Sequence, residues 1–215
     1  MAKVYMYVVA RDLGFAPNPF HGYCTLATCK PKIRNVATTG DWVIGFGGST
    51  LKATGKCIFA MRVTQKLTFN QYWNDPVFND KKPVQNGSQQ MLVGDNIYHQ
   101  NHNNIWEQSY SHHSYEDGST NKYNLNRDTG SDKVLISEHF YYFGNSAPLV
   151  PNHLLSEIGY KNKIGHRTFP LDEVSCMIHW LEKHYSQSLN RVDADPYDFD
   201  KSHSHYSVET NKINT

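Results

Sequence analysis

Three residues with metal-binding side chains, His21, Cys24 and Cys29, lie close together near the N-terminus. Their spacing, His-x2-Cys-x4-Cys, supplies three ligands, whereas a structural zinc site uses four and mostly short paired spacings. The sequence contains neither a Cys-x2-Cys pair nor the His-x-Glu and Pro-Cys-x-x-Cys signature of the zinc deaminases. We therefore expect no metal here, and no motif elsewhere implies a cofactor.

A second chemistry open to these residues is nucleophilic catalysis. A cysteine with a histidine base is the smallest set that supports it, and Cys24 with His112 or His113 meets that requirement. Asp95 is a further candidate for a general base. The same residue types also occur as inert, buried side chains. Cys24, Asp95 and His112 are the catalytic candidates, and whether the protein is an enzyme stays open.

The aromatic side chains suit a third task, the binding of a planar ligand. Phe20, Tyr98 and Trp106 offer ring faces on which a nucleobase can stack. Each such contact is worth roughly 1–3 kcal/mol, so two of them with a few hydrogen bonds give useful affinity. The alternative is that these rings belong to the hydrophobic core.

Polar side chains near these rings suit the edge of a base. Asn18, Asp95 and Asn96 carry donors and acceptors for this purpose, and His113 adds a polar contact. Arg11, after the first strand, either holds a phosphate or forms an ion pair with an aspartate, Asp12 or Asp132. These residues define a predicted ligand-binding set.

The N-terminal elements must position most of these side chains. Residues 4–10 alternate and are rich in β-branched types, which predicts a central strand, and two X-Pro pairs stiffen the loop that follows. Residues 23–28, which contain Cys24, form either a short strand or a first helical turn. A helix is expected over 30–37, beginning at Pro31.

The next elements are two strands and a helix. Strands are expected over 42–48 and, as one long and buried element, over 56–67, joined by a hairpin connection. A short helix over 68–73 is capped by Thr68 or Asn70.

The rest of the chain changes character twice. Residues 77–129 are polar yet aromatic, which favours a functional loop laid over a scaffold. Strands are expected over 133–137 and 139–144, and an amphipathic helix over 171–189. The polar tail from residue 191 is expected to be loosely ordered or to dock on the body.

The composition describes an aromatic chain of near-zero net charge. Hydrophobic residues make up 39% of its 215 positions, enough for a core, and its formal net charge is +1. A long duplex footprint needs many cations, so this charge favours a small ligand or one flipped base. The four cysteines are too few and too scattered for a disulfide scaffold. With no signal peptide and no apolar run of about 18 residues, we expect a cytoplasmic protein without a membrane segment.

Several motifs follow one another along the first 150 residues. They are the runs at residues 7–12, 18–20, 24–31, 40–45, 94–98 and 111–114. In this order they resemble the type 2 nucleotide-modification-associated domain family over residues 3 to about 150. The resemblance implies an association with bacterial and phage systems that modify or hypermodify DNA bases, in a bacterial host cell. It implies no established reaction.

A helix followed by Gly40-Asp41-Trp42-Val43-Ile44 is also similar, by architecture alone, to the pseudouridine-synthase-and-archaeosine-transglycosylase-like barrels, which hold a base in an aromatic cage. We expect an α+β fold with a mixed, curled sheet or partial barrel and a C-terminal amphipathic helix. The expected division is a nucleotide-modification-associated domain at 1–150, a helical extension at 151–190 and a polar tail at 191–215.

The leading functional prediction is recognition or processing of a modified nucleobase or nucleotide, free or within DNA, in an aromatic and polar pocket. Two alternatives stay open. One is an enzyme that modifies a nucleotide or DNA base through Cys24 or Asp95. The other is a protein that sequesters a free signalling nucleotide. The sequence does not indicate an oligomeric state.

Overall fold

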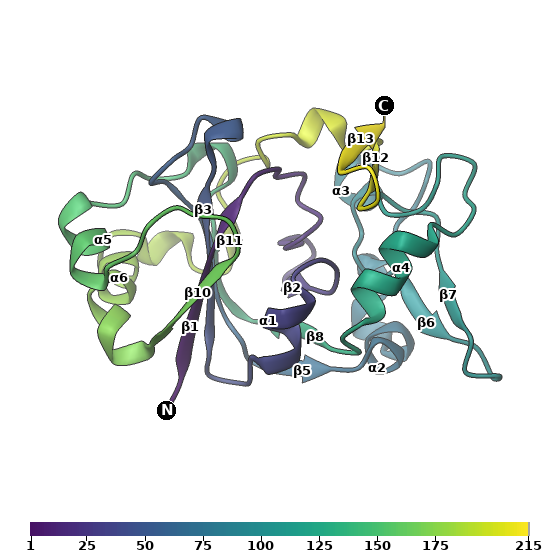
Figure 1. Ribbon diagram of the computed structural model, residues 1–215, viewed down its shortest axis with the longest axis horizontal. Helices are drawn as coiled ribbons and strands as arrows, with labels where there is room; N and C mark the ends of the chain where they lie inside the picture. Colours follow the sequence, from purple (N-terminus) through teal and green to yellow (C-terminus); the bar gives the residue numbers. More distant parts are fainter. Residues whose placement is uncertain (215) are drawn as a thin grey trace. The chain divides into compact units, whose positions relative to one another are not determined.

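The computed structural model describes residues 1–214, and they form two compact units. The first unit comprises residues 1–12, 37–65 and 137–197, and the second comprises residues 13–36, 66–136 and 198–215. Neither unit is a continuous stretch of chain, because the backbone passes from one to the other several times (Figure 1). The division at residues 150 and 190 stays a prediction.

The first unit is built on a six-stranded sheet in the order β10-β1-β3-β4-β9-β11. Its strands are β1 (Lys3–Val9), β3 (Trp42–Gly47), β4 (Cys57–Arg62), β9 (His139–Tyr142), β10 (His166–Pro170) and β11 (Arg191–Val192). β1 runs parallel to β3 and antiparallel to β10, and β9 runs parallel to β11. The sheet is therefore mixed and open, and the fold is a mixed α/β fold without a closed barrel.

The centre of this sheet is as apolar as the sequence predicts. All six residues of β3 are buried, and the predicted central strand is confirmed, since β1 has partners on both sides. Packing explains the glycine at position 45, because a Cβ there would lie 2.2 Å from a ring carbon of Phe59. The register between β3 and β4 shifts at this same position.

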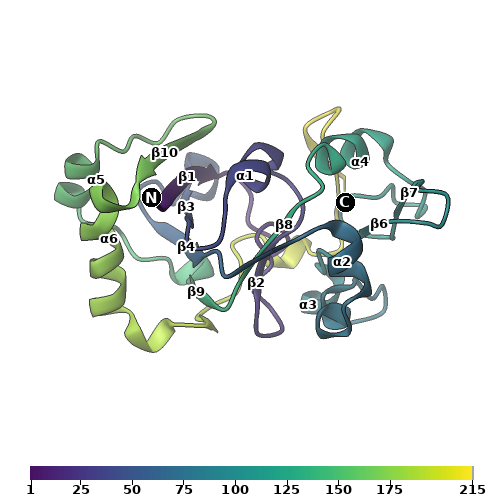
Figure 2. The ribbon, with the colours of Figure 1, turned by 90° about the horizontal axis from the view of Figure 1, so that it is seen from below.

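Helices cover one side of the sheet (Figure 2). They are α5 (Asn152–Ile158) and α6 (Leu171–His184), and short 3₁₀ turns occur at Ser49–Leu51, Gly144–Ser146 and Ser186–Ser188. The buried side chains of α6 are Val174, Met177, Ile178 and Leu181. The helix ends before the expected Leu189, because the backbone leaves helical geometry at Tyr185.

The second unit has three small sheets and four helices among the described residues. The strands are β2 (Cys24–Leu26), β5 (Gln65–Leu67), β6 (Tyr98–Gln100), β7 (Trp106–Gln108), β8 (Val134–Ser137), β12 (His205–Ser207) and β13 (Lys212–Asn214). β2, β8 and β5 form one sheet in that order, β6 pairs with β7, and β12 pairs with β13. The helices are α1 (Pro31–Val36), α2 (Phe69–Asn74), α3 (Gln89–Leu92) and α4 (Lys122–Thr129), with 3₁₀ segments at Pro76–Lys81 and Phe199–Lys201.

Several local predictions for this unit are confirmed. α1 begins at Pro31, and Thr68 caps α2 in a capping box with Gln71. The open choice at residues 23–28 resolves as a strand. The tail docks, because the Asn124 side chain on α4 hydrogen-bonds the backbone at Tyr206 and Val208 beside the β12–β13 hairpin (Figure 1).

Two predictions are wrong in extent. The expected single strand over 56–67 is two strands, because β4 pairs with β3 and β9 in the six-stranded sheet, whereas β5 pairs with β8 in a separate sheet. An apolar run does not reveal such a change of partner. The segment 77–129 is also more regular than a loop, since it contains α3, β6, β7 and α4. Among residues 1–214, no helix has both the length and the apolar character that a membrane span requires.

Candidate functional site

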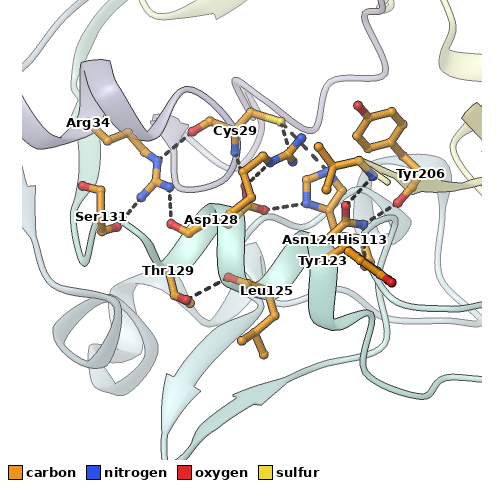
Figure 3. A network of polar contacts seen from close by, with 12 residues as sticks. Cys29, Arg34, His113, Tyr123, Asn124, Leu125, Asp128, Thr129, Ser131 and Tyr206 are labelled. Atoms are coloured by element: carbon orange, nitrogen blue, oxygen red, sulfur yellow. Dashed lines mark hydrogen bonds and ion pairs between the residues drawn. The ribbon is translucent and has the colours of Figure 1, made fainter. Parts of the chain in front are cut away.

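In the second unit, a cysteine contacts a histidine, and the same histidine contacts an aspartate (Figure 3). Cys29 Sγ lies 4.0 Å from His113 Nε2, and His113 Nδ1 lies 2.7 Å from Asp128 Oδ2. The order nucleophile, base and orienting carboxylate is that of a catalytic triad, which is recognised by geometry and not by sequence position. We call Cys29, His113, Asp128 and Arg127 the Cys29 cluster.

The backbone presents Cys29 in an unusual conformation. Cys29 and Lys30 have φ angles of 56° and 40°, in the left-handed region that residues with a Cβ rarely adopt. This two-residue turn joins β2 to Pro31 at the start of α1. Backbone strain of this kind clusters at functional sites, and a nucleophile on a sharp turn after a strand has its side chain displayed clear of the sheet.

A buried arginine holds the turn in place. The Arg34 guanidinium donates to the Cys29 carbonyl at 2.8 Å and to the Asp128 carbonyl at 2.5 Å, and it reaches the Ser131 carbonyl at 2.8 Å. Its side chain is fully buried. Since all of these acceptors are carbonyl oxygens, Arg34 fixes the backbone of the nucleophile relative to that of the carboxylate (Figure 3).

Asp128 is the centre of the polar contacts. It accepts hydrogen bonds from the Cys29 N–H at 3.0 Å, the Tyr98 hydroxyl at 3.1 Å and Arg127 Nε at 3.1 Å, in addition to its contact with His113. Burial acts to raise its pKa, but the charge and hydrogen bond of His113 and the charges of Arg127 and Arg34 hold the pKa of Asp128 well below its usual range. The carboxylate therefore stays ionised and orients the imidazole.

The same contacts shift the pKa of the Cys29 thiol and the pKa of the His113 imidazole in opposite directions. Burial opposes ionisation of Cys29, but its contact with His113 and the charge of Arg127 lower the pKa of the thiol below its ordinary value. For His113, the Asp128 carboxylate outweighs burial and raises the pKa to about 8. A lowered thiol pKa beside a raised histidine pKa describes a thiolate–imidazolium pair, the reactive form of a cysteine nucleophile.

The thiol is half-buried and lies among cations. Arg127 Nη2 lies 3.6 Å from Cys29 Sγ, and Lys30 follows in the chain with a half-buried side chain. The Arg127 guanidinium also lies 5.6 Å from the centre of the Tyr206 ring. These two cations can bind an anionic group next to the sulfur, as phosphate does with arginine and lysine.

Five residues earlier, Cys24 lies beside a second polar cluster of a different kind. Lys81 Nζ donates to the Asn18 carbonyl at 3.0 Å, Asn18 Oδ1 at 2.8 Å and the Tyr23 carbonyl at 2.6 Å, so its three protons have three acceptors. Asp95 accepts from Thr25 at 2.7 Å and from the Tyr72 hydroxyl at 2.8 Å. We call Lys81, Asn18, Asp95, Thr25 and Tyr72 the Lys81 cluster.

The Lys81 cluster is closed to solvent, and this changes the roles predicted for Cys24 and Asp95. Burial raises the pKa of the Cys24 thiol and of the Asp95 carboxyl and lowers the pKa of Lys81 to about 8. Cys24 and Asp95 are fully buried. A fully buried thiol with a raised pKa is a poor nucleophile, so Cys29 replaces Cys24 as the candidate, and Asp95 serves the buried network.

Several of the predicted binding residues make hydrogen bonds or ring contacts within the second unit. Phe20 is buried and stacks on Phe199 at 5.5 Å, and Asn96 donates to the carbonyls of Tyr72 and Phe78. Asn18 donates to the Val93 carbonyl at 2.8 Å. These three side chains connect backbone segments within the unit.

The remaining predicted residues have separate settings. Tyr98 is buried and donates to Asp128, and Trp106 packs edge-on against Phe69 at 5.7 Å. Arg11 belongs to the first unit and is half-buried. The structure therefore brings Tyr98 and His113 to the Cys29 cluster.

His112, the third catalytic candidate, lines a cavity of about 270 Å³ in the second unit. Its Nδ1 hydrogen-bonds the Ser204 carbonyl, and its ring packs edge-on against Phe15 at 5.3 Å. The neighbouring His113 ring contacts the same Phe15 at 4.7 Å. The adjacent histidines thus serve two features, His113 the triad and His112 the cavity.

No group of three or more His, Cys, Asp or Glu side chains among residues 1–214 has an arrangement that would hold a metal ion. The His21, Cys24 and Cys29 side chains do not form such a group.

The sequence patterns indicate no functional role for Asp128, Arg34 or Lys81, and they suggest Cys29 only as a metal ligand. Asp128 and Arg34 lie in short helices whose sequences contain no site motif. No local pattern marks the contact of Cys29 with His113, because the two residues lie 84 positions apart.

The family model described as nucleotide modification associated domain 2 matches residues 1–203, which extends beyond residues 3 to about 150, the stretch over which the motifs show the resemblance. It includes Cys29, His113 and Asp128. No curated protein and no solved structure matches the chain.

Proposed function

Because the chain belongs to the nucleotide modification associated domain 2 family, we propose that it is a thiol enzyme in which Cys29 attacks an electrophilic carbon of a nucleotide or modified nucleobase. The observation that supports this proposal is the Cys29–His113–Asp128 arrangement, with Sγ to Nε2 at 4.0 Å and Nδ1 to Oδ2 at 2.7 Å. The family description provides the substrate class, and the triad provides the reaction type.

The reaction proceeds in two balanced steps. The Cys29 thiolate attacks the carbon, an S–C bond forms, and the bond from that carbon to a nitrogen or oxygen leaving group breaks as the leaving atom takes the His113 Nε2 proton. A water or an acceptor group then gives a proton to His113 and attacks the same carbon. The S–C bond breaks, and the thiolate–imidazolium pair returns.

The other members of the site support these steps. Asp128 keeps the proton of His113 on Nδ1, so that Nε2 faces the sulfur. Arg127, at 3.6 Å from Sγ, stabilises negative charge that develops at the reacting carbon. Arg127 and Lys30 together favour a substrate whose phosphate lies beside the scissile bond.

The proposal extends to the setting that the motifs imply. The substrate is a nucleotide or modified base, free or within DNA, in a bacterial or phage DNA-modification system of the cytoplasm. The formal net charge of +1 supports a single nucleotide or one flipped base over a long duplex footprint.

Binding without turnover is the second candidate function. It is favoured by the separate cavity at His112, whose lining residues do not include Cys29. A protein that only recognises or sequesters a nucleotide would use this cavity and would not depend on the thiol.

Mass spectrometry of the protein mixed with nucleotides tests the proposal. Modified and unmodified nucleoside monophosphates and short oligonucleotides are incubated with the protein, and both products and covalent adducts are recorded. We expect product formation and an adduct on the Cys29 peptide, and we expect Cys29→Ser to lower turnover by about a thousandfold or more.

Cys176→Ser is the matched control, because Cys176 lies on α6 in the first unit. It should leave turnover unchanged. Turnover that survives Cys29→Ser at the wild-type rate would show that the thiol is not the nucleophile. Nucleotide binding without product or adduct would favour the binding function.

A further inference from the structure

The cavity beside His112 has a second property, a lining without Lys, Arg, Asp or Glu. Twelve residues from three segments, 83–86 with Leu92, 110–112 and 202–205, form its walls, and none of them is of these four types. A phosphate or a carboxylate would therefore find no lysine or arginine here, in contrast to the Cys29 cluster with Arg127 and Lys30.

Two histidines of the lining are fixed by hydrogen bonds. His205 Nδ1 donates to the Ser114 carbonyl at 3.1 Å, and its Nε2 lies 3.1 Å from the Tyr110 hydroxyl oxygen. His112 Nδ1 likewise donates to the Ser204 carbonyl. These contacts hold both imidazole rings in place at the wall of the cavity.

The walls differ in chemistry and match a planar ring. The lining includes the apolar side chains of Pro83, Val84 and Leu92 together with the rings of Tyr110 and of three histidines. Gln85 and Asn86 line the cavity and are exposed. Side-chain amides offer paired donors and acceptors, the groups that read the edge of a nucleobase.

We propose that this cavity binds the base of an uncharged nucleoside moiety, with ring contacts from Tyr110 and His112 and edge contacts from Gln85 and Asn86. The assignment of this base as part of the substrate rests on the proposed function of Cys29. The volume of about 270 Å³ suits one base or nucleoside and is too small for a dinucleotide.

The cavity and the Cys29 cluster are neighbours through two consecutive histidines. The ring centres of His112 and His113 lie 5.7 Å apart with the planes tilted by 31°, and both rings pack against Tyr206. This proximity supports the assignment of both features to one substrate. In that assignment the cavity receives the base, and the cationic Cys29 cluster receives the phosphate.

Titration of nucleosides into the Cys29→Ser protein tests this inference without turnover. The probes are adenosine, guanosine, cytidine, uridine and thymidine. Binding is measured by isothermal titration calorimetry and by saturation-transfer NMR. We expect at least one nucleoside to bind with a dissociation constant of about 1 mM or lower. The double variant Gln85→Ala/Asn86→Ala should weaken that binding by about tenfold or more.

Asn103→Ala is the matched control, an exposed amide in the turn between β6 and β7, and it should leave binding unchanged. His112→Ala provides a second test, read together with far-UV circular dichroism. If none of the five nucleosides binds, or if the Gln85/Asn86 variant binds as tightly as its parent, the base assignment is overturned.

The outcome for the cavity is distinguishable from the outcome for the thiol. Turnover through Cys29 without nucleoside binding would overturn only the cavity assignment. Binding in the cavity with turnover that ignores Cys29→Ser would overturn only the proposed nucleophile.

Discussion

Two cysteines five residues apart in the same unit have opposite surroundings. Cys24 lies in β2, fully buried beside the Lys81 cluster, and burial raises its pKa. Cys29 lies in the strained turn after β2, half-buried in the Cys29 cluster, and its neighbours lower its pKa. Both regions contain a buried carboxylate and a nearby cation. The difference is in what each carboxylate contacts.

In the Lys81 cluster, the two charged side chains form hydrogen bonds with uncharged groups of the surrounding protein. Asp95 bonds Thr25 and Tyr72, and Lys81 bonds two carbonyls and an amide oxygen. In the Cys29 cluster, Asp128 orients a histidine toward the thiol of Cys29, a residue that is only partly buried. A buried ion pair therefore becomes a functional site when its geometry includes a titratable group at an opening.

Alkylation should separate the two cysteines by the largest margin. At pH 6, iodoacetamide should modify Cys29 at least about a hundredfold faster than Cys24, because Cys29 has more thiolate and is reachable. Peptide mass spectrometry reads both rates in one sample, with Cys176 as an internal reference whose pKa is raised by burial. His113→Asn should slow the alkylation of Cys29 and leave the rate of Cys24 alkylation unchanged. Faster modification of Cys24 would reverse the comparison.

Replacing Lys81 and Arg127 by alanine should lower the free energy of unfolding by different amounts in the two clusters. Lys81→Ala leaves Asp95 and three acceptors buried without their partner and should cost about 3–5 kcal/mol of unfolding free energy. Arg127→Ala removes a partly exposed cation and should cost about 1 kcal/mol or less, while slowing Cys29 alkylation. Urea unfolding measures both. Equal losses of stability would show that the Cys29 cluster is as structural as its neighbour.

The pair of Lys81→Met and Asp95→Asn gives the matched control for this comparison. Because the double variant removes both charges, its loss should be smaller than the sum of the single losses.

The pH dependence of stability should show the smallest effect. The folded pKa of His113, about 8, is raised above its ordinary 6.5, so its contribution is complete below pH 6.5 and is lost as the pH rises through 8. This amounts to up to about 2 kcal/mol. The Cys29→Ser background removes the opposing titration of the thiol.

Adding Asp128→Asn in that background should abolish the dependence, since the carboxylate that raises the pKa is gone. Urea unfolding at pH 6 and pH 9 compares the two proteins. A dependence that persists in the double variant would assign it to a different group.

Local signals were sufficient for much of the fold and little of the site. Pro31 marked the start of α1, Thr68 marked the cap of α2, and β-branched alternation marked β1, because each of these depends on neighbours in sequence. The break between β4 and β5 has no such local signal, since it depends on the change of partner strands from β3 and β9 to β8.

The sequence by itself determined which thiol, imidazole and carboxylate side chains are present. It also determined the family, which is described as nucleotide modification associated domain 2. Only the tertiary structure decided which thiol has a histidine, a carboxylate and an arginine around it. His113 lies 84 positions after Cys29, and Asp128 lies 99 positions after it. The reactivity of a cysteine depends on charge and burial within a few ångströms, and chain folding alone brings those groups together. The same dependence made Cys24, the more motif-like choice, a buried structural residue.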